Sequence, residues 1–204
     1  MMSALKLRGL FGLWQRAASA RRALAHVLGD ARAAQIAEFA LSLPVLVLFV
    51  VGIFDFSSAL TLKQKLTNAA REGARVAAAD PASDLASPGA SGPLSVYDAY
   101  YIVDSYLISE QINDCGLASA KPTQSGTSLT WTSTASGCGT TSLVLTINRG
   151  CLQQESGNAT NTVGTCVTIS YPYNWRFANV AWLFGGSFSA NSSISTTAAA
   201  FNEN

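Results

Sequence analysis

Residues 33–54 read AAQIAEFALSLPVLVLFVVGIF, an apolar run that carries one carboxylate, Glu38, near its start. A helix that crosses the hydrocarbon core of a bilayer, roughly 30 Å thick, needs about 20 mostly apolar residues. The uncharged part from Phe39 to Phe54 gives about 24 Å of helix, and apolar residues on both sides extend it. Asp55 would then lie near the far interface, where a charge costs much less than at the bilayer centre. The run predicts a single membrane-spanning helix.

Basic residues gather before this run and set its expected orientation. One acid, Asp30, precedes Glu38, and the bases there are Lys6, Arg8, Arg16, Arg21, Arg22 and Arg32. An excess of bases marks the cytoplasmic end of a span, so we expect a basic cytoplasmic leader, residues 1–33, and an exported remainder. A cleaved secretory signal fits less well, because the basic region is long and no clear small-residue cleavage site follows the run. A stop-transfer anchor with no further role is the other alternative.

The exported part has the opposite charge balance, although the net charge of the whole chain is only +1. From residue 80 onward the acids are Asp80, Asp84, Asp98, Asp104, Glu110, Asp114, Glu155 and Glu203, and the bases are Lys121, Arg149 and Arg176. No basic surface for nucleic acid is therefore expected. One membrane pass is predicted, with the N-terminus in the cytoplasm and the C-terminal head outside it.

All four cysteines lie in the exported part, at Cys115, Cys138, Cys151 and Cys166. An even number of cysteines in an oxidising compartment predicts two disulfides. Of the three possible pairings, local order favours Cys115–Cys138 and Cys151–Cys166. A zinc site is the rival, but no pair has C-x-x-C spacing and the single histidine, His26, lies before the span. We expect no metal and no other cofactor.

The spanning helix is expected to continue beyond the membrane. Apolar and small residues recur at helical spacing up to Val76, so one transmembrane and extended helix over residues 34–80 is predicted. Pro44 is a potential kink within this helix, and Pro81 ends it. Residues 81–94 are rich in proline, glycine and serine and read as a linker.

Residues 95–204 are predicted to form a small α+β head. Ser95 is expected to cap a helix that ends near Asn113. Alternating patterns around Trp131, Leu145 and Ile169 predict strands of an antiparallel sheet. Pro172 should end the third of these strands or place it at an edge, and a weaker last strand is expected over 188–199. An aromatic loop is expected between the last two strands, and it either packs against the sheet or contacts the membrane or a partner. It contains Trp175, Phe177, Trp182, Leu183 and Phe184.

Several of these segments resemble one family. The sequence RAAQIAEFAL at 32–41 with Leu43-Pro44, GIFDF at 52–56, NAAREGAR at 68–75 and, more loosely, VTISYPY at 167–173 are similar to TadE-like (TadE/TadG) pseudopilins of bacterial tight-adherence, or Flp-type, pilus systems. The resemblance implies a pilin-like architecture, in which a long N-terminal transmembrane helix extends into a small head with one further helix and an antiparallel sheet.

The resemblance also implies particular residues and partners. A prepilin peptidase would cut between Ala33 and Ala34, so that Glu38 becomes the fifth residue of the mature chain. Ala33 stands where the family usually has glycine. After such a cut, Glu38 would pair with the new amino group of Ala34, on its own chain or a neighbour, and so set the register of packed helices. The alternative is an interfacial glutamate whose side chain reaches back to water. The implied partners are the inner membrane, other pilin-like subunits and the pilus assembly machinery.

The function predicted on these grounds is a minor pilin-like component of pilus biogenesis that acts by assembly and not by catalysis. A single-span adhesin or binding protein unrelated to pili is the alternative. A membrane-anchored enzyme is a third hypothesis, but the exported part contains no histidine for a Ser-His or Cys-His system.

Overall fold

The computed structural model describes most of the chain, and the residues it describes are 31–86, 92–139, 141–154, 161–178 and 191–202. Residues 1–30 of the predicted leader lie outside them. So do Trp182, Leu183 and Phe184 of the predicted aromatic loop. The chain divides into two compact units, one up to Val51 and one from Gly52 onward.

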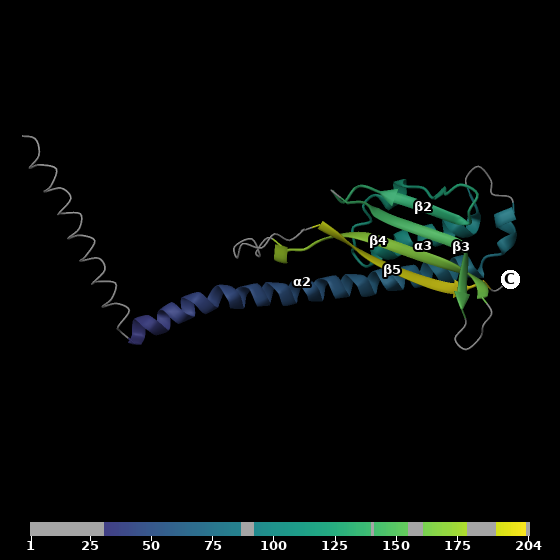
Figure 1. The fold of residues 1–204 in the computed structure, drawn as a ribbon. Helices are drawn as coiled ribbons and strands as arrows, with labels where there is room; N and C mark the ends of the chain where they lie inside the picture. The colour runs from purple at the N-terminus through teal and green to yellow at the C-terminus, as the bar shows by residue number, and fades with distance from the viewer. Residues whose placement is uncertain (1–30, 87–91, 140, 155–160, 179–190, 203–204) are drawn as a thin grey trace, which may run out of the picture. The chain divides into compact units, whose positions relative to one another are not determined.

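A single long helix, α2 (Ala31–Ala79), carries the apolar run (Figure 1). It continues through Pro44 even though proline supplies no backbone donor, and it ends before Pro81 as predicted. Its apolar part is long enough to cross a membrane, and none of that window is buried. Phe39 and Phe54, for example, are 64% and 71% exposed. Because so apolar a surface is unfavourable in water, α2 is a candidate membrane anchor.

The second long helix, α3 (Leu94–Ser109), differs from its prediction at both ends. The prediction that Ser95 caps it was wrong: Pro93 is the N-cap residue, and Ser95 is buried in the first turn. The backbone N–H of Ser95 donates instead to the Asp84 carboxylate at 2.8 Å. The expected end near Asn113 was also wrong, because Gln111 adopts a left-handed φ of 57° that stops the helix.

Five strands form one antiparallel sheet in chain order, so each strand pairs with its sequence neighbours. The strands are β1 (Thr123–Gln124), β2 (Thr130–Ala135), β3 (Leu143–Gln154), β4 (Asn161–Asn174) and β5 (Asn191–Phe201). Two short 3₁₀ helices, η1 (Ala82–Ala86) and η2 (Leu117–Ser119), flank α3. The last strand runs two residues past the predicted Ala199, because it stays paired with β4 up to Gly164.

Pro172 does not end β4, which continues to Asn174. The pairing of β4 with β3 stops at Ser170, whereas its pairing with β5 continues through Pro172 opposite Ser193. Pro172 therefore lies where β4 has a neighbour on one side only. This is the edge position that proline tolerates.

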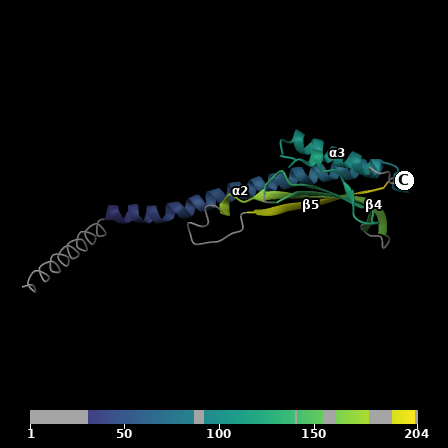
Figure 2. The same ribbon diagram turned by 90° about the horizontal axis from the view of Figure 1, so that it is seen from above.

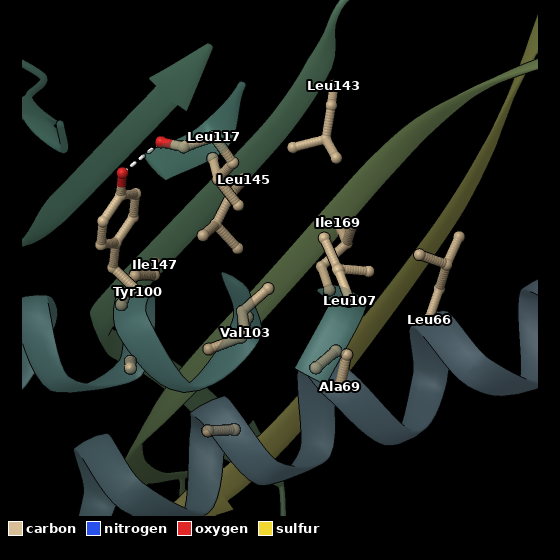
Figure 3. Packing of buried hydrophobic residues seen from close by; sticks show 14 of the residues in the cluster. Leu66, Ala69, Tyr100, Val103, Leu107, Leu117, Leu143, Leu145, Ile147 and Ile169 are labelled. Carbon is tan, nitrogen blue, oxygen red and sulfur yellow. Dashed lines mark hydrogen bonds between the residues drawn. The ribbon is translucent and has the colours of Figure 1, made fainter. Parts of the chain in front are cut away.

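The core lies between one face of the sheet and the helices α2 and α3 (Figures 1 and 2). Along β3 the buried residues alternate, as period-two patterning requires. In Figure 3 Leu66 and Ala69 of α2 and Leu107 of α3 gather around Ile169 of β4. The Tyr100 hydroxyl donates to the backbone oxygen of Leu117 in η2. The predicted fold class, a long apolar helix with a small α+β head, is confirmed.

Candidate functional site

Asp55 stands at the end of the uncharged part of α2, and its carboxylate is almost fully buried, at 4% exposed. The hydroxyl of Tyr173 donates to Oδ1 of Asp55 at 2.9 Å, and the backbone N–H of Phe177 donates to Oδ2 at 2.9 Å. The same hydroxyl lies 3.1 Å from the backbone oxygen of Asp55. A buried carboxylate needs such donors, because it would otherwise lose its hydration without compensation. The end of β4 is therefore fastened to this point of α2.

The environment of Tyr173 keeps it a donor. Burial, then the hydrogen bond and the negative charge of Asp55, raise the pKa of Tyr173 to about 12. The hydroxyl therefore stays protonated at every physiological pH. Sequence analysis gave Asp55 no partner, although one signal was present: a lone acid at the end of an apolar run needs a donor, and two tyrosines follow in the segment that resembles the family.

A second polar contact fastens the opposite end of the α2 segment that packs on the head. It comes from Arg149, which is 1% exposed. In β3 the residues Arg149 and Gly150 lie between the pairs Asn148–Cys166 and Cys151–Gly164, so two residues oppose the single residue Thr165. This is a β-bulge, a device that alters the direction of a strand and its side chains.

The Arg149 guanidinium caps the C-terminal end of α2. Its Nη1 donates to the backbone oxygen of Ala77 and, at 2.9 Å, to Oγ1 of Thr165. Its Nη2 donates to the backbone oxygen of Asp80 at 3.1 Å. The last carbonyls of a helix lack partners within the helix and carry its negative dipole end, so a cation is favourable there. Burial lowers the pKa of Arg149, while Asp84 and Asp80 oppose that shift.

Between Asp55 and Ala77, the residue that Arg149 contacts, small side chains on α2 let the helix pack close to the head. We call the contact of residues 55–80 with β4, β5 and α3 the helix–head seam. A Cβ atom at Gly73 would come within 2.7 Å of Val103 Cγ2 on α3. Thr67 and Thr196 share a hydrogen bond of 2.9 Å. Since Tyr173 meets Asp55 and Thr165 meets the Arg149 cap beside Ala77, β4 runs antiparallel to α2 along the seam.

Glu38 lies on the other unit, in an open groove on the surface of α2. The groove is apolar except for two side chains, and it is lined by Glu38, Leu41, Ser42, Val45, Leu46, Phe49 and Val50. These residues recur every three or four positions and so share one face of the helix. Ser42 turns its hydroxyl back to the Phe39 carbonyl at 3.1 Å, which satisfies its donor within the helix. The exposed polar group left in the groove is thus the carboxylate of Glu38.

The predicted processing junction, between Ala33 and Ala34, lies at the N-terminal end of the described part of α2. Its use by a peptidase stays a prediction.

The structure joins the four cysteines in the order that local spacing favours. Cys115 pairs with Cys138, and Cys151 pairs with Cys166. The second disulfide joins β3 to β4 beside the bulge that presents Arg149. It therefore holds the two strands together at the end of the seam. Within the described ranges no group of three or more His, Cys, Asp or Glu side chains could hold a metal ion.

Part of the long helix matches a known protein family. Residues 33–75 match the family described as TadE-like protein. The resemblance predicted from the sequence is confirmed over this segment, which is about a fifth of the chain and lies within α2. No curated protein and no solved structure matches the chain.

The TadE-like family is a family of pilus components, and the match to it is confined to α2. The matched segment contains Ala33, Ala34, Glu38 and Asp55, and it includes most of the α2 side of the seam. Arg149 and Tyr173 lie outside it. The matched segment therefore includes one partner of the Asp55–Tyr173 contact. It includes neither Arg149 nor the residues that Arg149 contacts, Ala77, Asp80 and Thr165.

Proposed function

We propose that this chain is a minor pilin-like component of tight-adherence pilus biogenesis that acts by assembly. The observation that carries the proposal is the TadE-like match on a helix whose first part is apolar and exposed, while one face of its second part packs against a folded head. Such a helix has one surface for lipid or other subunits and another for its own head. No catalytic step is needed for this role.

Its proposed place is the bacterial inner membrane, with the N-terminus in the cytoplasm and the head outside it. The basic residues before the span support this orientation. The two disulfides support it as well, because disulfides persist in oxidising compartments and are rare in the cytoplasm. Protease added to spheroplasts should then degrade the head, and full protection of residues 100–204 would contradict the orientation.

The Glu38 groove is the proposed site of contact with other pilin-like subunits. A carboxylate among apolar side chains in lipid is costly, so a cationic partner is favourable there. The amino group that cleavage would create at Ala34 is one such cation, on this chain or on a neighbour. Pairing would fix the register between packed helices, while apolar groove residues supply the contact area.

Cleavage itself is tested by the mass of the intact protein. A prepilin peptidase acting between Ala33 and Ala34 leaves 204 − 33 = 171 residues. Ala33→Gly should speed the reaction, because glycine reaches backbone conformations that alanine avoids. A full-length mass for both proteins, in cells with an active peptidase, would show that the chain keeps its leader.

The assembly role is tested by deletion and complementation in the bacterium that carries the gene. Loss of surface pili on deletion, restored by the wild-type chain and weakened by Glu38→Ala, is the expected result. Glu38→Gln is the matched control, because it keeps the shape and removes the charge. Normal piliation in the deletion strain would reject the proposed function.

A further inference from the structure

The end of β4 and the turn after it lie against the part of α2 that closes the apolar run. The Phe177 ring lies 3.5 Å from where a Cβ would stand on Gly52, and the Phe177 N–H is bonded to Asp55. Tyr173 is bonded to Asp55 as well. These contacts place the end of β4 beside residues 52–55, at the same position along the axis of α2.

The level of residues 52–55 follows from the span. If the hydrocarbon core begins at Phe39, about 20 residues of helix carry it to Ser58; if it begins at Ala33, it ends at Gly52. Residues 52–55 therefore lie at the boundary between the hydrocarbon and the lipid headgroups, or just inside it. Since Tyr173 and Phe177 touch those residues, the β4 end must reach the same depth.

The side chains at the β4 end suit that depth. Tyr173 and Trp175 pack edge to face with ring centroids 4.9 Å apart. The indole N–H of Trp175 donates to the Ser192 hydroxyl at 2.6 Å, so its polar atom is satisfied. Tyrosine and tryptophan are enriched at the membrane interface because each has an apolar ring and a polar tip. Arg176 beside them is exposed and carries a charge that attracts anionic headgroups.

From this geometry we propose that Tyr173, Trp175 and Phe177 form a lipid-contacting surface at the interface of the leaflet on the head side. The proposal rests on α2 spanning the bilayer, and it adds a second attachment of the head to the membrane. The β4 end of the head then contacts the lipid directly. The occupant of the surface is phospholipid at the level of the headgroups and upper acyl chains.

The test measures the depth of Trp175 by fluorescence quenching in vesicles. The full chain is reconstituted in phosphatidylcholine and phosphatidylglycerol carrying bromine either high on the acyl chain or near its end. Trp14 and Trp182 are replaced by phenylalanine, which leaves Trp175 and the core residue Trp131. A further Trp175→Phe variant gives the Trp131 signal alone, so the difference belongs to Trp175.

Two reference positions make the result decisive. In the Trp175→Phe background, Phe49→Trp reports the middle of the span and Leu152→Trp reports an exposed site on β3, beyond the bulge. We expect Trp175 to be quenched most by bromine placed high on the chain, Phe49→Trp most by bromine near the chain end, and Leu152→Trp by neither. A quenched Phe49→Trp with Trp175 no more quenched than Leu152→Trp would overturn the inference and leave the anchor standing. Absence of quenching at Phe49→Trp would reject the membrane anchor, and the inference with it.

Discussion

Replacing Arg149 by methionine should unfold the head at lower denaturant concentration. The change removes three hydrogen bonds from a charged donor, to Ala77, Asp80 and Thr165. Thr165 keeps a partner, because its hydroxyl donates to Asn202 at 2.8 Å. The two carbonyls at the end of α2 lose theirs. The cost is therefore concentrated at the helix terminus.

The size of the effect is a balance of two terms. A buried polar group left without a partner costs about 1–3 kcal/mol, so two carbonyls cost about 2–6 kcal/mol. Methionine also removes a buried charge, and this recovers part of the desolvation penalty that lowers the pKa of Arg149. We expect a net loss of about 2–4 kcal/mol in the free energy of unfolding. Arg149→Lys keeps the positive charge but not the planar guanidinium, so it should lower the free energy of unfolding by less than Arg149→Met does.

The assay is urea unfolding of the full chain in detergent micelles with the disulfides intact, followed by near-ultraviolet circular dichroism. Arg71→Met is the matched control: Arg71 is exposed on α2, and its loss should change stability by less than about 0.5 kcal/mol. If Arg149→Met were as stable as Arg71→Met, or more stable than the wild type, the helix-capping role of Arg149 would be refuted.

Three further predictions concern the stability of the head. Gly73→Ala should lower its free energy of unfolding by about 1–3 kcal/mol, because the new methyl group would collide with Val103. Gly52→Ala should leave the free energy of unfolding unchanged or raise it in the same assay, because the new methyl group would lie 3.5 Å from the Phe177 ring. The pKa values of Tyr100 and Tyr173 are raised to about 12, so the stability that the two tyrosines add is complete below about pH 10 and is lost as the pH rises towards 12. Titration of the tyrosinate absorbance checks this prediction. Full ionisation of all tyrosines near pH 10 in the folded state would contradict it. Reduction of each disulfide should cost about 2–4 kcal/mol, and alkylation of the folded chain without reductant should label no cysteine.

The elements with strong periodicity could be predicted from the sequence. The apolar run and the small residues after it gave α2, and alternation gave the central strands. The ends of elements were harder, because they depend on single backbone conformations. Gln111 stops α3 with a left-handed φ that glutamine seldom adopts, and no composition rule indicates it. Ser95 fits the composition of a cap, but Pro93, two residues earlier, takes the N-cap position with an extended backbone.

The polar contacts of the seam could not be predicted, because each joins residues far apart in the chain. Asp55 and Tyr173 are separated by 118 positions, and Arg149 and Ala77 by 72. Arg149 read as one of three scattered bases in an acidic region, and only the bulge in β3 shows that it reaches the end of α2. Glu38 could be singled out from the sequence, because the free-energy cost of a carboxylate within an apolar run depends only on its neighbours in the chain. The predicted domain boundaries and the role of Glu38 stay predictions.

Photo-crosslinking in cells tests the proposed assembly role most directly. A benzoylphenylalanine placed at Leu46 in the Glu38 groove should form an adduct with another pilin-like subunit, and the adduct should disappear in cells that lack the pilus assembly machinery. The same probe at the exposed Leu152 of the head should give no such adduct. No adduct from the groove in piliated cells, or the same adduct without the machinery, would contradict assembly through the long helix.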